Sequence, residues 1–332
     1  SKNLAISPMY DISKRSIKPL ISIVVPVFNE TETVGHFVEK ISALFKNFTG
    51  ADHEVIFVDD GSTDSTLELI LQLQRVHQSI RVVELSRNFG KEAALSAGLE
   101  LCSGHVIVPM DVDLQDPPEL ILPMLEKWRE GFDVVLGKRT DRDADSFLKR
   151  NSASLFYRLH NKISEPKIPE NVGDFRLMDR AVIDVLKQLP ESRRFMKGLF
   201  AWIGFRTTEL EYKRPPRIAG KTKFSGWRLW NFALEGITSF STDPLKIWTY
   251  IGLLVASISF IFSIFLVVRV LIQGVDVPGY ASIMVAVTFL GGLQLIGIGI
   301  IGEYLGRSYL ESKRRPVYVV RKIYDPEVLN GS

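Results

Sequence analysis

Asp111 and Asp113 are the residues of this chain whose type and spacing most clearly suggest chemistry. They follow a short apolar run, residues 106–110, which is typical of a buried strand. Because alternate residues of an extended backbone point the same way, the two carboxylates can face one point at the strand end. Two converging oxygen ligands suit a hard divalent cation such as Mg²⁺ or Mn²⁺, which keeps positions open for substrate phosphates. An acidic surface turn is the alternative interpretation.

The elements that must position this pair are strands alternating with helices. The predicted strands are residues 20–26, 54–58, 80–85, 106–109 and 134–139, the last ending in a basic pair. The predicted helices are residues 33–45, 67–77 and an Ala-rich segment ending at 101. This alternation predicts an α/β fold with a mostly parallel sheet, whose right-handed crossovers bring the strand ends to one edge. Residues 28–30, 59–61 and 111–113 are therefore expected at one rim, where open α/β sheets bind ligands.

Composition excludes several classes of site. The chain has 332 residues, enough for one sizeable domain and an addition. Its net charge of +3 does not indicate nucleic-acid binding, and we expect no nucleic-acid partner. Cys102 is the single cysteine, which excludes an intrachain disulfide and a cysteine-based zinc site. The first residues are polar and have no apolar core like that of a signal peptide.

Three motifs, in this order and spacing, resemble those of family 2 glycosyltransferases with the GT-A fold. They are Val-Pro-Val-Phe-Asn-Glu at 25–30, Val-Asp-Asp-Gly-Ser-Thr-Asp at 58–64 and Asp-Val-Asp-Leu-Gln-Asp-Pro-Pro-Glu at 111–119. The third motif is similar to that of the polyprenyl-phosphate branch, which includes dolichyl-phosphate mannose synthases and bacterial polyprenyl-phosphate glucosyltransferases. Residues 171–180 and 217–224 extend the resemblance, although Thr222 and Phe224 replace the usual Ser and Tyr.

The resemblance implies an inverting, metal-dependent transfer of a sugar from a nucleotide-sugar to a membrane polyprenyl phosphate. Asp111, Asp113 and Gln115 would bind Mg²⁺ or Mn²⁺, which would neutralise the leaving diphosphate as a Lewis acid. The residues expected to contact the donor are Pro26, Phe28, Glu30, Val58, Asp60 and Val112. Phe28 can stack on a base, and carboxylates can accept hydrogen bonds from ribose hydroxyls.

Basic residues and one further acid are expected on the acceptor side. Arg139 would contact the donor phosphates, and Arg217 and Lys223 would bind the diphosphate or the acceptor phosphate. A phosphate acceptor is already an anion, so it needs little help from a general base. Asp174 is the candidate base or acceptor-orienting acid, and its alternative role is to hold Arg176. Lys91 is favoured as a surface lysine at a helix start rather than a donor contact.

The last third of the chain predicts a membrane region. Residues 248–268 and 277–302 are uncharged and exceed the roughly 20 residues that cross a bilayer. Two buried core helices are the alternative. Both outer flanks are basic, which places the catalytic domain in the cytoplasm, with a bacterial-type plasma membrane favoured. Residues 225–246 predict an interfacial amphipathic helix, and residues 147–163 predict a second one or an ordinary surface helix.

These segments define the expected organisation of the chain. The Gly-x-x-x-Gly spacing at 302–306 suits packing between the two spans or self-association, and we expect a homo-oligomer. The domains are an N-terminal arm at 1–19, a GT-A domain at 20–224, a juxtamembrane helix at 225–246, two transmembrane helices at 247–306 and a cytoplasmic tail at 307–332.

The resemblance favours UDP-glucose as donor for a lipid-linked sugar used in cell-envelope glycosylation, with GDP-mannose as the alternative. A processive polysaccharide synthase would carry a Gln-x-x-Arg-Trp motif, whereas Gln188 is followed here by Leu-Pro-Glu. A non-enzymatic membrane scaffold would not need the acidic and basic residues named above. A nucleotidyltransferase would have a Gly-rich basic turn after the first strand.

Overall fold

The computed structural model describes residues 15, 18–46, 48–140, 172–189, 196–212 and 279–326, with single residues and pairs between 248 and 272. The predicted amphipathic helices at 147–163 and 225–246 lie outside the described residues, as do Arg217, Lys223 and most of the N-terminal arm. Those expectations stay predictions.

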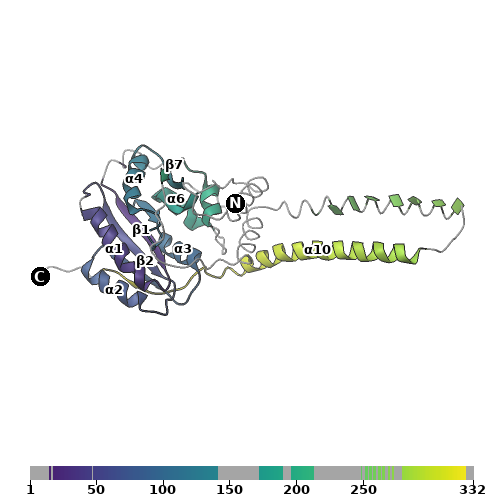
Figure 1. The fold of residues 1–332 in the computed structure, drawn as a ribbon, viewed down its shortest axis with the longest axis horizontal. Coiled ribbons are helices and arrows are strands. Elements are labelled where there is room, and N and C mark those ends of the chain that lie inside the picture. The colour runs from purple at the N-terminus through teal and green to yellow at the C-terminus, as the bar shows by residue number, and fades with distance from the viewer. Residues whose placement is uncertain are drawn as a thin grey trace.

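A sheet of eight strands in the order β7-β5-β6-β4-β1-β2-β3-β8 forms the centre of the α/β part (Figure 1). The strands are β1 (Leu20–Val27), β2 (Asp52–Asp59), β3 (Ile80–Leu85), β4 (Val106–Pro109), β5 (Val134–Arg139), β6 (Val172–Asp179), β7 (Thr207–Tyr212) and β8 (Val320–Tyr324). Strands β4, β1, β2 and β3 pair in parallel, while β6 and β8 are antiparallel to their neighbours. The first four predicted strands are thus confirmed as the parallel centre of a mixed sheet, and the fifth is confirmed as β5.

Helices cover both faces of the sheet because successive strand residues point to opposite sides. In β1, Ile23 and Val25 belong to one core cluster, whereas Val24 belongs to the other. The first cluster includes side chains of α1 (Thr31–Lys46), α2 (Thr66–Val76) and α4 (Ile121–Arg129), which follows η2 (Pro118–Leu120). The second includes side chains of α3 (Lys91–Leu101), α6 (Arg180–Gln188) and α7 (Met196–Ile203).

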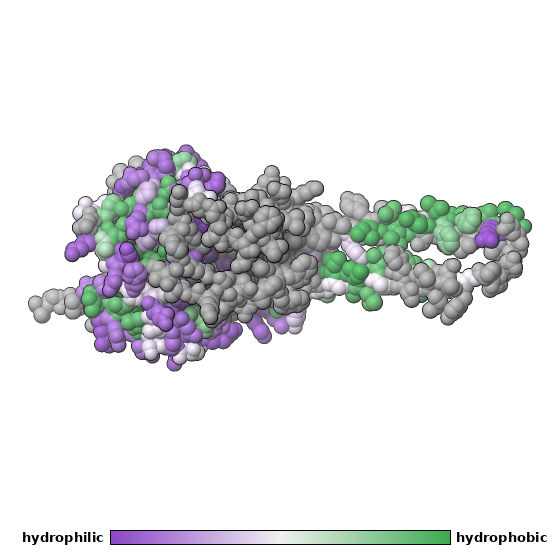
Figure 2. Space-filling model, in the orientation of Figure 1, coloured by the Kyte–Doolittle hydropathy of each residue, from purple (hydrophilic) through white to green (hydrophobic). Residues whose placement is uncertain are grey.

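The helix α10 (Tyr280–Ser312) extends away from the α/β part, beside the described pieces of residues 251–272 (Figure 1). Figure 2 shows hydrophobic side chains along this extension. Many are exposed, including Leu254, Phe262, Leu271 and Leu295. A Cβ atom added to Gly297 would overlap the Trp248 indole, so the two segments meet closely there.

Among the residues that the structure describes, no helix has the combined length and apolar character needed to cross a membrane. The two predicted transmembrane helices are therefore unconfirmed. The chain continues after α10 into β8, which pairs antiparallel with β3 at the edge of the sheet. The sequence pattern had not predicted this strand.

Candidate active site

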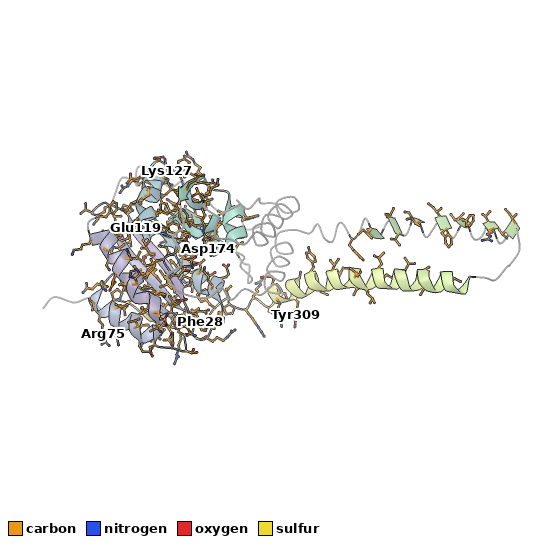
Figure 3. The ribbon with its side chains drawn as sticks, viewed as in Figure 1. Phe28, Arg75, Glu119, Lys127, Asp174 and Tyr309 are labelled. Carbon is orange, nitrogen blue, oxygen red and sulfur yellow. The ribbon has the colours of Figure 1, made fainter. Side chains whose placement is uncertain are left out.

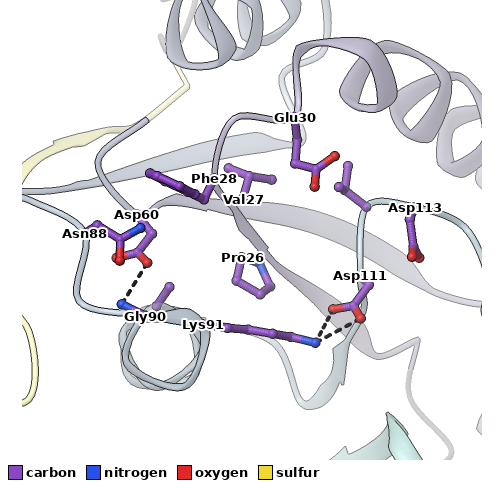
Figure 4. Close-up of a pocket in the computed structure, with 12 residues that line it drawn as sticks. Pro26, Val27, Phe28, Glu30, Asp60, Asn88, Gly90, Lys91, Asp111 and Asp113 are labelled. Atoms are coloured by element: carbon purple, nitrogen blue, oxygen red, sulfur yellow. Dashed lines mark hydrogen bonds and ion pairs between the residues drawn. The ribbon is translucent and has the colours of Figure 1, made fainter. Parts of the chain in front are cut away.

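A pocket of about 320 Å³ opens at the carboxyl ends of β1, β2 and β4 (Figure 4). Seven of the predicted site residues line it: Pro26, Phe28, Glu30, Asp60, Asp111, Val112 and Asp113. Five further residues of the lining were not predicted as site residues: Val27, Asn88, Gly90, Lys91 and Ala94. Most of these belong to the loop after β3 and to the start of α3, where the sequence carries no acidic motif. The expected gathering of three strand ends at one rim is confirmed.

Backbone amides of the loop after β3 hold Asp60 in the wall of the pocket. Its two carboxylate oxygens accept hydrogen bonds from the Phe89 and Gly90 amides at 2.7 and 2.9 Å. Burial raises the pKa of Asp60, and these two hydrogen bonds oppose that rise. Gly90 has a φ of 99°, a backbone conformation that favours glycine. The loop after β3 therefore fixes the Asp60 carboxylate, which serves as a hydrogen-bond acceptor in the wall of the pocket.

The turns after β1 and β2 are joined by side-chain hydrogen bonds. Asn29, which has a φ of 55°, accepts a hydrogen bond from the Thr63 amide at 2.8 Å through its side-chain oxygen. The Ser62 hydroxyl accepts one from the Asn29 amide at 3.0 Å. These contacts hold the neighbouring Phe28, a residue that is 42% exposed, at the mouth of the pocket. An exposed ring beside a carboxylate suits a base and its ribose.

Lys91 makes the closest contacts in the acidic part of the pocket. Its ammonium lies 2.7 Å from Asp111 Oδ1, 2.9 Å from Asp111 Oδ2 and 3.1 Å from Asp174 Oδ2. Burial lowers the pKa of Lys91, but the two carboxylates outweigh it and raise that pKa above its usual value. Lys91 is the first residue of α3 and its side chain is 46% exposed, so the interpretation of Lys91 as a surface lysine at a helix start is confirmed. The structure adds that its ammonium links Asp111 to Asp174.

A buried guanidinium supports the segment that carries Asp174. Arg176 donates a hydrogen bond to the Gly173 carbonyl at 2.9 Å, and its guanidinium carbon lies 4.1 Å from the Phe200 ring centroid. Burial lowers the pKa of Arg176 to about 10. Arg176 also donates to the backbone carbonyl of Asp174 at 3.4 Å, whereas the Asp174 carboxylate faces Lys91. Asp174 thus contacts Lys91 through its carboxylate as well as Arg176 through its backbone carbonyl.

Arg139 lies at the end of β5 with two partners. Its Nε donates to the Tyr212 hydroxyl at 3.3 Å, and its guanidinium lies 3.5 Å from Asp116. The Tyr212 hydroxyl in turn donates to Asp116. Burial and the Asp116 carboxylate raise the pKa of Tyr212 to about 12, so it remains a donor at neutral pH. Arg139 does not line the pocket, and its phosphate contact stays a prediction.

The residues present fit a divalent cation that is shared with a bound diphosphate. Asp111 and Asp113 both line the pocket, and such cations often combine one or two carboxylates with substrate phosphates. In the described part of the chain no group of three or more His, Cys, Asp or Glu residues could hold a metal by itself. Gln115 is buried and does not line the pocket. Its side-chain Nε2 has no hydrogen-bond partner among the described residues. Its role as a ligand stays a prediction.

Comparison with known proteins assigns the family. A model of glycosyl transferase family 2 matches residues 22–186. The bactoprenol glucosyl transferase of Shigella phage SfV is 53% identical over 301 residues, which is 91% of this chain and 98% of that protein. The chain belongs to glycosyl transferase family 2. A prophage bactoprenol glucosyl transferase homolog of Escherichia coli K12 is 52% identical over 303 residues, 91% of this chain and 99% of that protein.

The chain is also similar to solved structures. The glucosyl-3-phosphoglycerate synthase of Mycobacterium tuberculosis, in complex with Mn²⁺, UDP-glucose and phosphoglyceric acid, is 20% identical. It aligns with a TM-score of 0.47 over 70% of this chain and 83% of that chain. The resemblance to this family is confirmed by the sequence relatives, and the α/β fold with its parallel centre agrees with it.

Not every predicted site residue reaches the pocket of this family 2 glycosyltransferase. Val58 is fully buried in β2 and does not line the pocket. Arg217 and Lys223 lie outside the described residues. The roles of Val58, Arg217 and Lys223 therefore stay predictions.

Proposed function

We propose that this enzyme transfers glucose from UDP-glucose to a membrane polyprenyl phosphate with inversion at the sugar carbon. The observation that carries the proposal is the meeting of Phe28, Asp60 and the Asp111–Asp113 pair in one pocket. That pocket offers a stacking ring, an acceptor for ribose hydroxyls and carboxylates for a shared cation. The relatives named bactoprenol glucosyl transferase support glucose and a lipid phosphate as the two substrates.

On the donor side, Phe28 stacks on the base while Glu30 and Asp60 accept hydrogen bonds from ribose. Asp111 and Asp113, with Gln115, would hold the cation, and a bound Mg²⁺ or Mn²⁺ would supply positive charge to stabilise the leaving diphosphate. Because Asp60 is held by two backbone amides, it needs no rearrangement to receive the nucleotide.

On the acceptor side, the phosphate attacks the sugar carbon as an anion, so the reaction needs little proton abstraction. Arg139, Arg217 and Lys223 supply positive charge for the acceptor phosphate and the leaving diphosphate. Asp174 orients the groups at this side of the pocket. The contacts with Tyr212 and Asp116 fix the direction of the Arg139 guanidinium, which supports this role.

The two predicted transmembrane helices belong to this proposal, with the catalytic domain on the cytoplasmic side and the protein as a homo-oligomer. Support comes from the exposed apolar side chains of α10 and of residues 251–272, since large exposed apolar surfaces mark protein or membrane contacts. Figure 3 adds that Phe28 and Asp174 lie nearer to Tyr309, along the long axis, than Arg75 and Lys127 do. A lipid acceptor would reach a pocket on that side.

Transfer can be tested with purified full-length protein, labelled nucleotide-sugars and polyprenyl phosphate in detergent. We expect label from UDP-glucose in an organic-extractable lipid that is labile to mild acid. Faster labelling from GDP-mannose would replace the donor assignment and leave the reaction class standing. Label recovered only in polymer, or no lipid label from any donor, would contradict the proposal.

A further inference from the structure

Lys91 occupies a position that the proposed reaction does not explain. It is the first residue of α3, and its ammonium contacts both oxygens of Asp111 at 2.7 and 2.9 Å. The same ammonium contacts Asp174 at 3.1 Å, and this residue is carried by β6 (Figure 4 shows the Asp111 contacts). A single cation therefore connects the acid after β4 with the acid of β6.

The contact with both oxygens of Asp111 has an electrostatic consequence. A divalent cation bound by Asp111 would lie within a few ångströms of the Lys91 ammonium if that ammonium stayed in place. Two positive charges at such a separation repel each other, so each weakens the binding of the other to Asp111. Asp174 offers Lys91 a second carboxylate at 3.1 Å.

Resting on the proposed function, we propose that Lys91 is an internal counter-cation that competes with the divalent metal for Asp111. Metal entry then transfers the Lys91 ammonium wholly to Asp174. Without the metal, Lys91 neutralises Asp111 and prevents repulsion between the two carboxylates. With the metal bound, the Lys91–Asp174 pair faces the acceptor side, and an acid paired in this way orients groups rather than abstracting protons.

Competition of this kind is reciprocal, which makes it measurable without turnover. If metal binding displaces Lys91, removal of the Lys91 charge strengthens metal binding by the same free energy. The Lys91 side chain is 46% exposed and that of Asp111 is 37% exposed, so solvent screens their interaction. We expect K91M and K91Q to bind Mn²⁺ about 3- to 10-fold more tightly than the wild type.

The experiment titrates full-length protein in detergent with Mn²⁺ alone and measures the free ion by electron paramagnetic resonance. K91R keeps the charge and is expected to bind Mn²⁺ within about twofold of the wild type. K138M is the matched control, because Lys138 pairs with Glu209 and lies outside the pocket. D113N reports whether Mn²⁺ binds at this site, and thermal unfolding of each variant reports whether it is folded.

The outcomes separate the inference from the proposed function. Loss of Mn²⁺ binding in D113N together with unchanged affinity in K91M and K91Q would overturn the competition and leave the metal site in place. Equal binding by the wild type and D113N, or no binding by any variant, would overturn the metal role and the competition with it. Tighter binding in K138M as well would reduce the effect to net charge and also contradict the proposal.

Discussion

Asp111 and Asp113 have different surroundings although one residue separates them. Asp111 faces Lys91, whereas Asp113 accepts a hydrogen bond from the Gln115 amide at 3.2 Å. Leu114, between Asp113 and Gln115, has a φ of 53°, which costs on the order of 1 kcal/mol for a residue with a side chain. Strained residues of this kind concentrate at functional sites. The turn after β4 thus directs both carboxylates into the pocket.

D113N tests the catalytic role of this acid at the scale of one residue. We expect transfer to fall by a factor on the order of 10² or more, because the amide cannot supply the charge that binds the metal. The free energy of unfolding should change by about 0.5 kcal/mol or less, since an asparagine oxygen can still accept the Gln115 hydrogen bond. Radiolabel transfer and thermal unfolding measure the two effects.

D52N is the matched control for that substitution, because Asp52 lies at the start of β2 and pairs with Lys18 on the surface. It should keep near wild-type activity. Full activity of D113N, or of the wild type under strict metal chelation, would rule out the metal role.

At the scale of elements, α3 decides where Lys91 lies. Gly98 lets this helix approach the sheet, because a Cβ atom there would collide with Val24 and lie 3.0 Å from a methyl carbon of Val58. Its neighbours in α3 are small and buried, including Ala94 and Ala97. Larger side chains on this face of α3 would move the start of the helix, and Lys91 with it, away from Asp111.

G98A should therefore destabilise the protein even though alanine is the better helix former. Overpacking against β1 and β2 costs about 1–3 kcal/mol, which exceeds the gain of about 1 kcal/mol in helix propensity. Denaturant unfolding measures the difference. G35A in α1 is the control, since no described atom lies within 4 Å of the added Cβ, and it should leave stability unchanged or raise it. Equal effects of the two substitutions would refute the packing argument.

At the scale of the whole molecule, the chain returns from α10 to the sheet that it left. The Tyr324 hydroxyl of β8 donates to Glu84 of β3 at 2.9 Å, and Gln74 of α2 donates to the Tyr324 carbonyl at 2.8 Å. Arg321 lies 3.0 Å from the same Glu84 carboxylate. The segment beyond the apolar region is therefore part of the α/β fold.

Y324F should lower the free energy of unfolding by about 1–2 kcal/mol, because the largely buried Glu84 loses a hydrogen bond. Thermal or denaturant unfolding of the full chain measures it. Y309F on α10 is the control, because it removes a tyrosine hydroxyl from a residue that is 60% exposed. It should leave the free energy of unfolding unchanged. If Y324F left the free energy of unfolding unchanged, β8 would contribute little to the stability of the sheet.

Membrane insertion is the second expectation at this scale. If the two apolar segments cross a bilayer, the full chain should stay in the membrane pellet after alkaline carbonate and leave it only with detergent. Release by carbonate would contradict the transmembrane proposal. A version of the chain that lacks residues 248–302 provides no clean control, because β8 lies beyond them and pairs with β3.

The sequence by itself determined the parallel centre of the sheet, the family and most of the pocket. Apolar runs followed by Phe28–Glu30, Asp60 and the Asp111–Asp113 pair are local patterns, and burial in a parallel sheet converts them into strand ends at one edge. The tertiary structure alone decided the partners of Lys91 and the pairing of β8. Asp174 is 83 positions from Lys91, and Tyr324 is 240 positions from Glu84. Contacts across such separations depend on how helices and strands pack, and no local periodicity encodes them.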